Sequence, residues 1–303
     1  MKRALAIVII CMLVPAFAQS QDKKTPAKKP TTRKAAAKKA ESVSAVPLAR
    51  VVAPSAKKGE DKLVPLYQID SASHKNPPAY SRLSQILNSQ VLRVCVRADI
   101  PPFGYLSGGK LTGFDIHLAR LLGKRLSIHF KKNLHISWKI VQAKKRVKSL
   151  LQNRCDFVVA SFSKTAKRAK QVGFSRIYYK TDKVLIERKP MTAKEPVIAV
   201  VRGTTMPKIK GLKGTVVQFN DYNEIIFAMS AGEIDYAIAD QPIGIHMIRS
   251  SNKNYRIARS LGQAEMYGVG VNKSNTHLLK AINAALLDLA NSGELAYLQR
   301  QWL

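Results

Sequence analysis

Short apolar segments alternate with helical patterns from about residue 81 onward, and this alternation constrains the fold more than any other feature. Near-continuous apolar strands are typical of sheets that are covered on both faces. Strands that alternate with helices imply parallel sheets with right-handed crossovers. The sequence therefore predicts an α/β fold, and its length allows two lobes. The expected strands are residues 91–96, 136–141, 156–160, 183–187, 196–201, 215–219, 234–239 and 267–271, and the clearest helical stripes are 114–122 and 278–289.

The first residues carry the pattern of a secretory signal peptide. Lys2 and Arg3 precede an apolar run, and AlaPheAla at 16–18 is a small-residue cleavage pattern. The run is too short for a membrane-spanning helix. We therefore expect residues 1–18 to be removed after Ala18, leaving a soluble protein in the periplasm.

Residues 19–80 form a basic segment rich in Lys, Ala and Pro, with 13 Lys and Arg against 5 Asp and Glu. Because core-forming residues are sparse there, we expect the segment to be disordered. Residues 81–303 still carry +22 of the net charge of +32. This charge either holds the exported protein near an anionic envelope surface or only maintains solubility. Nucleic-acid binding is not expected, because the chain shows no recognition motif.

Two cysteines remain in the mature chain, Cys95 and Cys155, each in or beside an expected strand. A disulfide between them is possible in an oxidising compartment. The alternative that we favour is two separate buried thiols packed as small apolar groups. The Cys and His residues show no spacing typical of a metal site.

The apolar strand at 155–160 runs directly into Ser161, Ser163 and Arg168. Ligands of open α/β sheets bind at the carboxyl ends of the strands. A planar guanidinium matches a carboxylate with paired hydrogen bonds, which a lysine cannot copy. This segment therefore predicts a carboxylate-binding site.

Further motifs follow a fixed order along the chain. They are ValLeuArgValCysValArgAlaAspIleProProPheGlyTyr at 91–105, GlyLysLeuThrGlyPheAspIleHisLeuAla at 109–119, SerPheSerLysThrAlaLysArg at 161–168, ArgGlyThrThr at 202–205, and GlyGluIleAspTyrAlaIleAlaAsp at 232–240. Together they resemble the family 3 periplasmic solute-binding proteins, which serve amino-acid importers of the ABC type. The resemblance covers about residues 82–303.

The resemblance implies a two-lobed periplasmic-binding-protein type II fold, with a mostly parallel sheet in each lobe. Lobe 1 would comprise 81–187 and 267–303, lobe 2 would comprise 188–266, and two crossing strands would form the hinge. The ligand would lie in the cleft and be buried by closure. A monomer that delivers an amino acid to a membrane permease, without any cofactor, is expected.

The resemblance also implies roles for individual residues. Hydroxyl groups and an arginine of lobe 1, with a loop of lobe 2, would hold the ligand α-carboxylate, and Asp240 would take the α-ammonium. The residues expected to hold the carboxylate are Ser161, Ser163, Arg168, Thr204 and Thr205.

Arg97 and Arg146 resemble the two basic positions that hold the ligand's side-chain carboxylate in the glutamate/aspartate-binding branch. We therefore expect glutamate or aspartate as the ligand and rejection of lysine and arginine by like charge. Otherwise, these two arginines are solvated surface cations. Phe103 forms either an apolar wall of the cleft or an ordinary part of the core.

Two other classes of function compete with solute capture. A dehydratase-like periplasmic enzyme would need a general acid in the cleft. Its candidates are Glu224, Glu233 and Glu265, but the chain has no recognised catalytic motif. In the other class, the protein would interact with the envelope through its basic segment. The sequence identifies neither the amino acid nor the permease.

Overall fold

The computed structural model describes residues 77–206, 212–251 and 253–303. The expected signal peptide and nearly all of the basic segment lie outside the described residues, so both remain predictions. No described helix combines the length and the apolar character needed to cross a bilayer.

One eight-stranded sheet runs through the described part of the chain, in the order β5-β1-β6-β11-β7-β10-β8-β9. A smaller sheet has the order β2-β3-β4. The strands of the large sheet are β1 Val91–Val96, β5 His135–Ile140, β6 Phe157–Val158, β7 Val172–Arg188, β8 Val197–Val201, β9 Thr215–Phe219, β10 Tyr236–Asp240 and β11 Tyr255–Asn272. Those of the small sheet are β2 Asp99–Ile100, β3 Gly104–Ser107 and β4 Lys110–Thr112.

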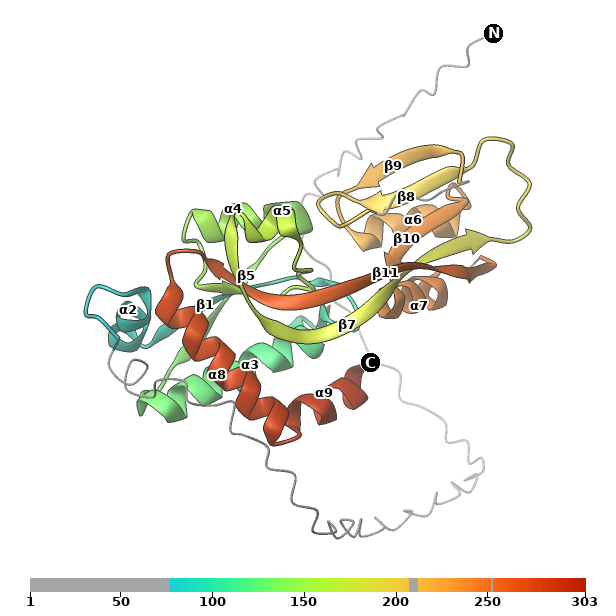
Figure 1. Ribbon diagram of the computed structural model, residues 1–303. Helices are drawn as coiled ribbons and strands as arrows, with labels where there is room; N and C mark the ends of the chain where they lie inside the picture. Colours follow the sequence, from blue (N-terminus) through green and yellow to red (C-terminus); the bar gives the residue numbers. More distant parts are fainter. Residues whose placement is uncertain (1–76, 207–211, 252) are drawn as a thin grey trace, which may run out of the picture. The chain divides into compact units, whose positions relative to one another are not determined.

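Helices flank the large sheet in both halves of the fold (Figure 1). They are α2 Arg82–Ser89, α3 Phe114–Phe130, α4 Arg146–Leu151, α5 Ala166–Ala169, α6 Tyr222–Ala231, α7 Gln241–Ser250, α8 Thr276–Asn291 and α9 Glu294–Trp302, with a 3-10 turn at Ala143–Lys145. Local sequence fixes several boundaries. Ser81 and Asp221 accept hydrogen bonds from the first turns of α2 and α6, respectively, and Gly232 ends α6 in the left-handed conformation.

Two long antiparallel strands, β7 and β11, connect the halves (Figure 1). On one side, β11 pairs with β6 and leads to the parallel strands β1 and β5. On the other side, β7 pairs with β10 and leads to the parallel strands β8 and β9. Parallel pairing within each half agrees with the sequence. The two crossing strands implied by the resemblance are also present, but they are much longer than residues 183–187 and 267–271, the segments expected as strands there.

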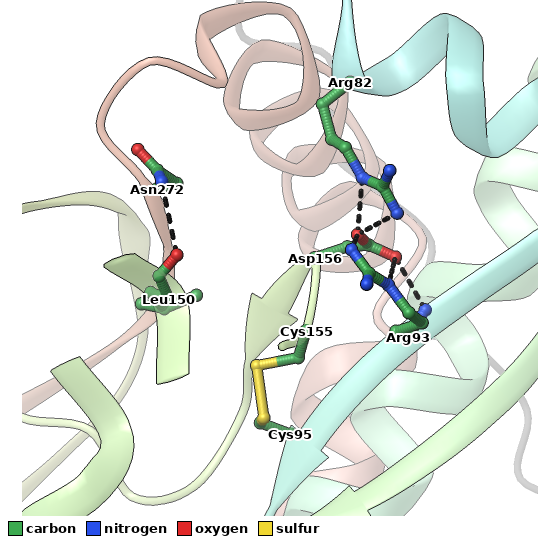
Figure 2. The surroundings of a disulfide bond; sticks show 7 residues. All are labelled: Arg82, Arg93, Cys95, Leu150, Cys155, Asp156 and Asn272. Atoms are coloured by element: carbon green, nitrogen blue, oxygen red, sulfur yellow. Dashed lines mark hydrogen bonds and ion pairs between the residues drawn. A yellow bond between two sulfur atoms is a disulfide. The ribbon is translucent and has the colours of Figure 1, made fainter. Parts of the chain in front are cut away.

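A disulfide joins Cys95 of β1 to Cys155, just before β6, with 5.7 Å between their Cα atoms (Figure 2). The favoured expectation of two separate thiols is therefore wrong. The adjacent Asp156 carboxylate is buried and accepts hydrogen bonds from Arg82 Nε and from the backbone N–H of Arg93, each at 2.7 Å. The disulfide and this carboxylate together attach β6 to α2 and β1.

Reduction of the disulfide should lower the free energy of unfolding by about 4 kcal/mol, because the bond closes a long loop in the unfolded chain. The two cysteines are separated by 60 positions. The measurement is urea unfolding with and without a reductant. Cys95→Ala/Cys155→Ala is the matched control, since reductant should leave its unfolding midpoint unchanged. Equal midpoints for oxidised and reduced wild-type protein would contradict this expectation.

Candidate functional site

A small cavity lies where the loops of the two lobes meet. Its lining residues are Arg97, Arg146, Ser161, Ser163, Thr204, Thr205, Tyr222, Asp240 and Ile243. The sequence singled out nine site residues, and seven of them line this cavity. The two that do not line it are Phe103 and Arg168. The cavity volume is only about 10 Å³, roughly the room that one water molecule needs. The lobes are therefore closed around it.

The loop after β6 is held by a buried carboxylate of α3. Asp115 Oδ2 accepts from the backbone N–H of Ser161 at 2.7 Å and from its hydroxyl at 3.3 Å, and Oδ1 accepts from Tyr178 Oη at 2.9 Å. Ser161 has a φ of 46°, which is uncommon for a residue other than glycine. Burial raises the pKa of Asp115 to about 6, against the lowering effect of these hydrogen bonds. Asp115 thus fixes a strained turn that carries two of the expected ligand hydroxyls.

Arg146 is fully buried, and its guanidinium donates to four backbone carbonyls. Its partners in lobe 1 are the carbonyls of Ala143, Ala160 and Ser161, at 2.9 to 3.0 Å, and Gly203 accepts from lobe 2 at 3.2 Å. Burial, followed by the charges of Arg168 and Arg97, lowers the pKa of Arg146 to about 9, so it is still a cation at neutral pH. No described carboxylate forms an ion pair with it.

Arg168 occupies the first turn of α5, where Thr165 caps its backbone N–H. Its guanidinium donates to Ser163 O at 2.8 Å and, across the lobes, to Gly203 O at 2.9 Å. Arg146 and Arg168 both lie over the Phe162 ring, at 4.8 and 5.1 Å from its centroid. Burial lowers the pKa of Arg168, and the nearby Glu265 and Asp240 oppose that shift.

Gly203 therefore accepts from both arginines, and its backbone packs closely on lobe 1. It has a φ of 86°, and a Cβ added there would lie 2.4 Å from Lys144 Cα. Lys144 Nζ also donates across the lobes to Asn220 Oδ1 at 2.9 Å. The closed arrangement thus depends on close backbone approach at Gly203.

Asp240 ends β10 on the opposite side of the cavity and is already engaged within the protein. Oδ1 accepts from Lys183 Nζ at 2.6 Å, and Oδ2 accepts from Tyr267 Oη. The Thr205 hydroxyl donates to Glu265 at 2.5 Å, and the Thr204 hydroxyl donates to Val201 O at 2.7 Å.

Arg97 lines the cavity but faces a local partner. Its Nε donates to Asp99 Oδ1 at 2.8 Å, its Nη2 donates to Asp99 Oδ2, and the guanidinium lies over the Tyr222 ring. Phe103 is fully buried and packs edge-on against Phe114 and Tyr267. Phe103 therefore lies in the core behind the cavity.

Sequence reasoning missed several residues at this site. Tyr222 and Ile243 line the cavity, and Asp99 and Lys183 pair with expected site residues. Asp99 follows Arg97 by two positions, which could have suggested the pair. No sequence signal distinguished Lys183 from the many other lysines. Among the described residues, no cluster of His, Cys, Asp and Glu could hold a metal ion.

Comparison with known proteins assigns this architecture to a protein family. The model of the bacterial extracellular solute-binding proteins, family 3, matches residues 92–303. The chain belongs to this family. It is 28% identical to the ABC transporter glutamine-binding protein GlnH of Bacillus subtilis, over 73% of this chain and 84% of the relative.

Solved structures of this fold agree closely. A solute receptor for L-cysteine of Neisseria gonorrhoeae superposes with a TM-score of 0.66 at 26% identity, covering 73% of this chain and 93% of the receptor. A mutant of ArgBP from T. maritima gives a TM-score of 0.65 at 27% identity, covering 73% and 98%. The family 3 protein therefore has the two-lobed type II fold expected from the sequence. The family to which the chain belongs is one of solute-binding proteins rather than of enzymes.

The free energy of unfolding should depend on pH through the protonation of Asp115. Its pKa is raised from 3.8 to about 6 in the folded protein, so the folded state binds the proton more tightly than the unfolded state does. This contribution is fully present below about pH 4 and is lost as pH rises to about 6. Wild-type protein should thus lose about 3 kcal/mol of stability relative to Asp115→Asn between pH 4 and pH 7. Parallel unfolding profiles of the two proteins over this range would contradict the assignment.

Gly203→Ala should prevent closure, because the added methyl group would collide with the Lys144 backbone. Gly109→Ala is the matched control: Gly109 also has a positive φ, 75°, but no atom lies within 4 Å of an added Cβ. Both variants carry the backbone strain of a side chain at positive φ. With saturating L-glutamate, the ligand expected from the sequence, small-angle scattering should show compaction of wild type and Gly109→Ala only. Compaction of Gly203→Ala would refute the role of Gly203.

Proposed function

We propose that this protein captures a small amino acid in the interlobe cleft and delivers it to the membrane permease of an ABC importer. The observation that carries the proposal is one cavity lined by the guanidinium groups of Arg97 and Arg146, by serine and threonine hydroxyls and by the Asp240 carboxylate. A zwitterion needs a cationic group and a carboxylate on opposite sides of one small cavity. The glutamine-binding relative and the L-cysteine receptor support an amino acid as the ligand.

The ligand α-carboxylate binds between Arg168, the hydroxyls of Ser161 and Ser163, and the loop that carries Thr204 and Thr205. Arg168 now donates to the Gly203 carbonyl. A carboxylate is a stronger acceptor for a guanidinium than a neutral carbonyl. Arg168 has further N–H donors besides those given to Ser163 O and Gly203 O, so ligand binding adds a charge-assisted hydrogen bond to the closed arrangement. The α-ammonium lies against Asp240.

The side chain of the ligand lies toward Arg97 and Arg146. These two cations favour an acidic side chain, and glutamate or aspartate is the finer assignment that we propose. The Arg97 guanidinium is shared with Asp99, so a ligand carboxylate competes with that pair. The secreted, periplasmic location rests on the sequence pattern of residues 1–18.

A thermal-shift screen of the twenty amino acids, followed by calorimetry, tests the function. L-Glutamate or L-aspartate should raise the melting temperature most, because a ligand of the native state stabilises it by mass action. Arg168→Lys keeps the charge but loses the paired geometry, and it should weaken binding on the order of 10- to 100-fold. Arg176→Lys, at an exposed arginine, is the control and should bind normally. If no amino acid stabilises the protein, the proposed function is wrong. If lysine or arginine stabilises it most, only the assignment of an acidic amino acid as the ligand is wrong.

A further inference from the structure

A buried cluster of charges lies directly behind the carboxylate that faces the cleft. Lys183 of β7 and Glu265 of β11 are only 1% and 2% exposed. Lys183 Nζ lies 2.6 Å from Asp240 Oδ1 and 3.6 Å from Glu265 Oε1. Glu265 Oε1 also accepts from the Thr205 hydroxyl and, at 3.1 Å, from Gln263 Nε2. Of the three charged groups, only Asp240 lines the cavity.

Lys183 already supplies the ammonium group that Asp240 would otherwise require from a ligand. A buried carboxylate without a cation is strongly unfavourable. Where a ligand ammonium is the only partner, a ligand that lacks this group leaves the carboxylate uncompensated. Here the pair of Lys183 and Asp240 compensates it permanently. Glu265 is in turn close enough to Arg168 to oppose the lowering of the arginine's pKa.

The charges of the cleft are therefore balanced within the protein on the side of Asp240. Lys183 and Arg168 offset Asp240 and Glu265, and Arg97 offsets Asp99. Within the described part of the chain, Arg146 donates only to backbone carbonyls, and it contributes a further positive charge. Such a cleft gains most from an anionic ligand, and no described carboxylate in it depends on a cationic group from the ligand.

We propose that Lys183 lets this cleft accept carboxylates that lack an α-ammonium group, such as glutarate or succinate, besides amino acids. The inference rests on the proposed function, because it concerns the same cleft. Lys183 acts through Asp240 rather than by touching the ligand. One unit charge at ~6 Å, at an effective dielectric constant of about 20, changes the affinity of a charged group on the order of 10- to 100-fold.

The test compares L-glutamate with glutarate, which differs only by the missing ammonium group. The quantity measured by calorimetry is the ratio of the two Kd values, glutarate over L-glutamate. If another amino acid binds best in the screen, that amino acid and its counterpart without the ammonium group replace this pair. We expect a ratio of at most about tenfold in wild-type protein, since Lys183 replaces much of the missing ammonium. A larger ratio would overturn the inference.

A double-mutant cycle of Lys183 and Glu265 tests whether the tolerance of a missing ammonium group depends on Lys183. Lys183→Met leaves Asp240 uncompensated and should raise the ratio by about tenfold or more. Glu265→Gln removes an anion, keeps the acceptor for Thr205, and should lower the ratio. In the double variant Lys183→Met/Glu265→Gln, the ratio should return toward the wild-type value. This variant has one buried carboxylate fewer than Lys183→Met, so it can be measured even if Lys183→Met folds poorly. A purely structural role would change both Kd values together, and a constant ratio through the cycle would overturn the inference.

The two proposals fail in different ways. If the wild-type protein binds an amino acid but its ratio exceeds tenfold, only the inference about Lys183 falls. If the wild-type protein binds no amino acid, the proposed function falls and this inference falls with it.

Discussion

Two guanidinium groups, one buried and one half-buried, share one backbone carbonyl and hold the lobes of this protein against each other. Arg146 and Arg168 both donate to Gly203 O. The remaining donors of Arg146 end on carbonyls of lobe 1, so its side chain fixes the loop after β6 relative to the turn after β8. A glycine at the turn is required, because any Cβ would meet the Lys144 backbone.

The sequence predicts the fold well where local patterns and burial coincide. The apolar runs of β1, β8 and β10 are mostly buried and were expected close to their observed positions. The crossing strands were underestimated, because their middle sections alternate between buried and exposed residues and form no apolar run. The disulfide was the less favoured of two alternatives, because the sequence does not show whether the two cysteines lie close together. It depends on the register that brings β6 beside β1, and residues 60 positions apart reveal nothing of it.

At the candidate site, the sequence likewise identified individual residues better than the contacts between them. The sequence identified seven residues that line the cavity, because their chemistry and order resemble a known family. It did not identify their partners. Arg97 was counted as a free cation, whereas Asp99 accepts from two of its donors. Lys183 was one of many lysines in a chain with a net charge of +32. In so basic a chain, the sequence does not show which few cations are buried and paired with a specific carboxylate.

The two sides of the cleft are built in different ways. Lys183 and Asp240 are register partners on adjacent, hydrogen-bonded strands, β7 and β10. Because β7 and β10 pair through their backbones, we expect this ion pair to persist when the lobes separate, even though Lys183 lies within the sequence range expected for lobe 1. The hydrogen bonds of Arg146 and Arg168 to Gly203 cross between the lobes and are lost on opening. If the ligand binds as proposed, the side that would face its ammonium is thus preformed, and the side that would face its carboxylate is assembled by closure. Closure would then depend on the carboxylate end of the ligand, whose interactions would differ most between the open and closed states.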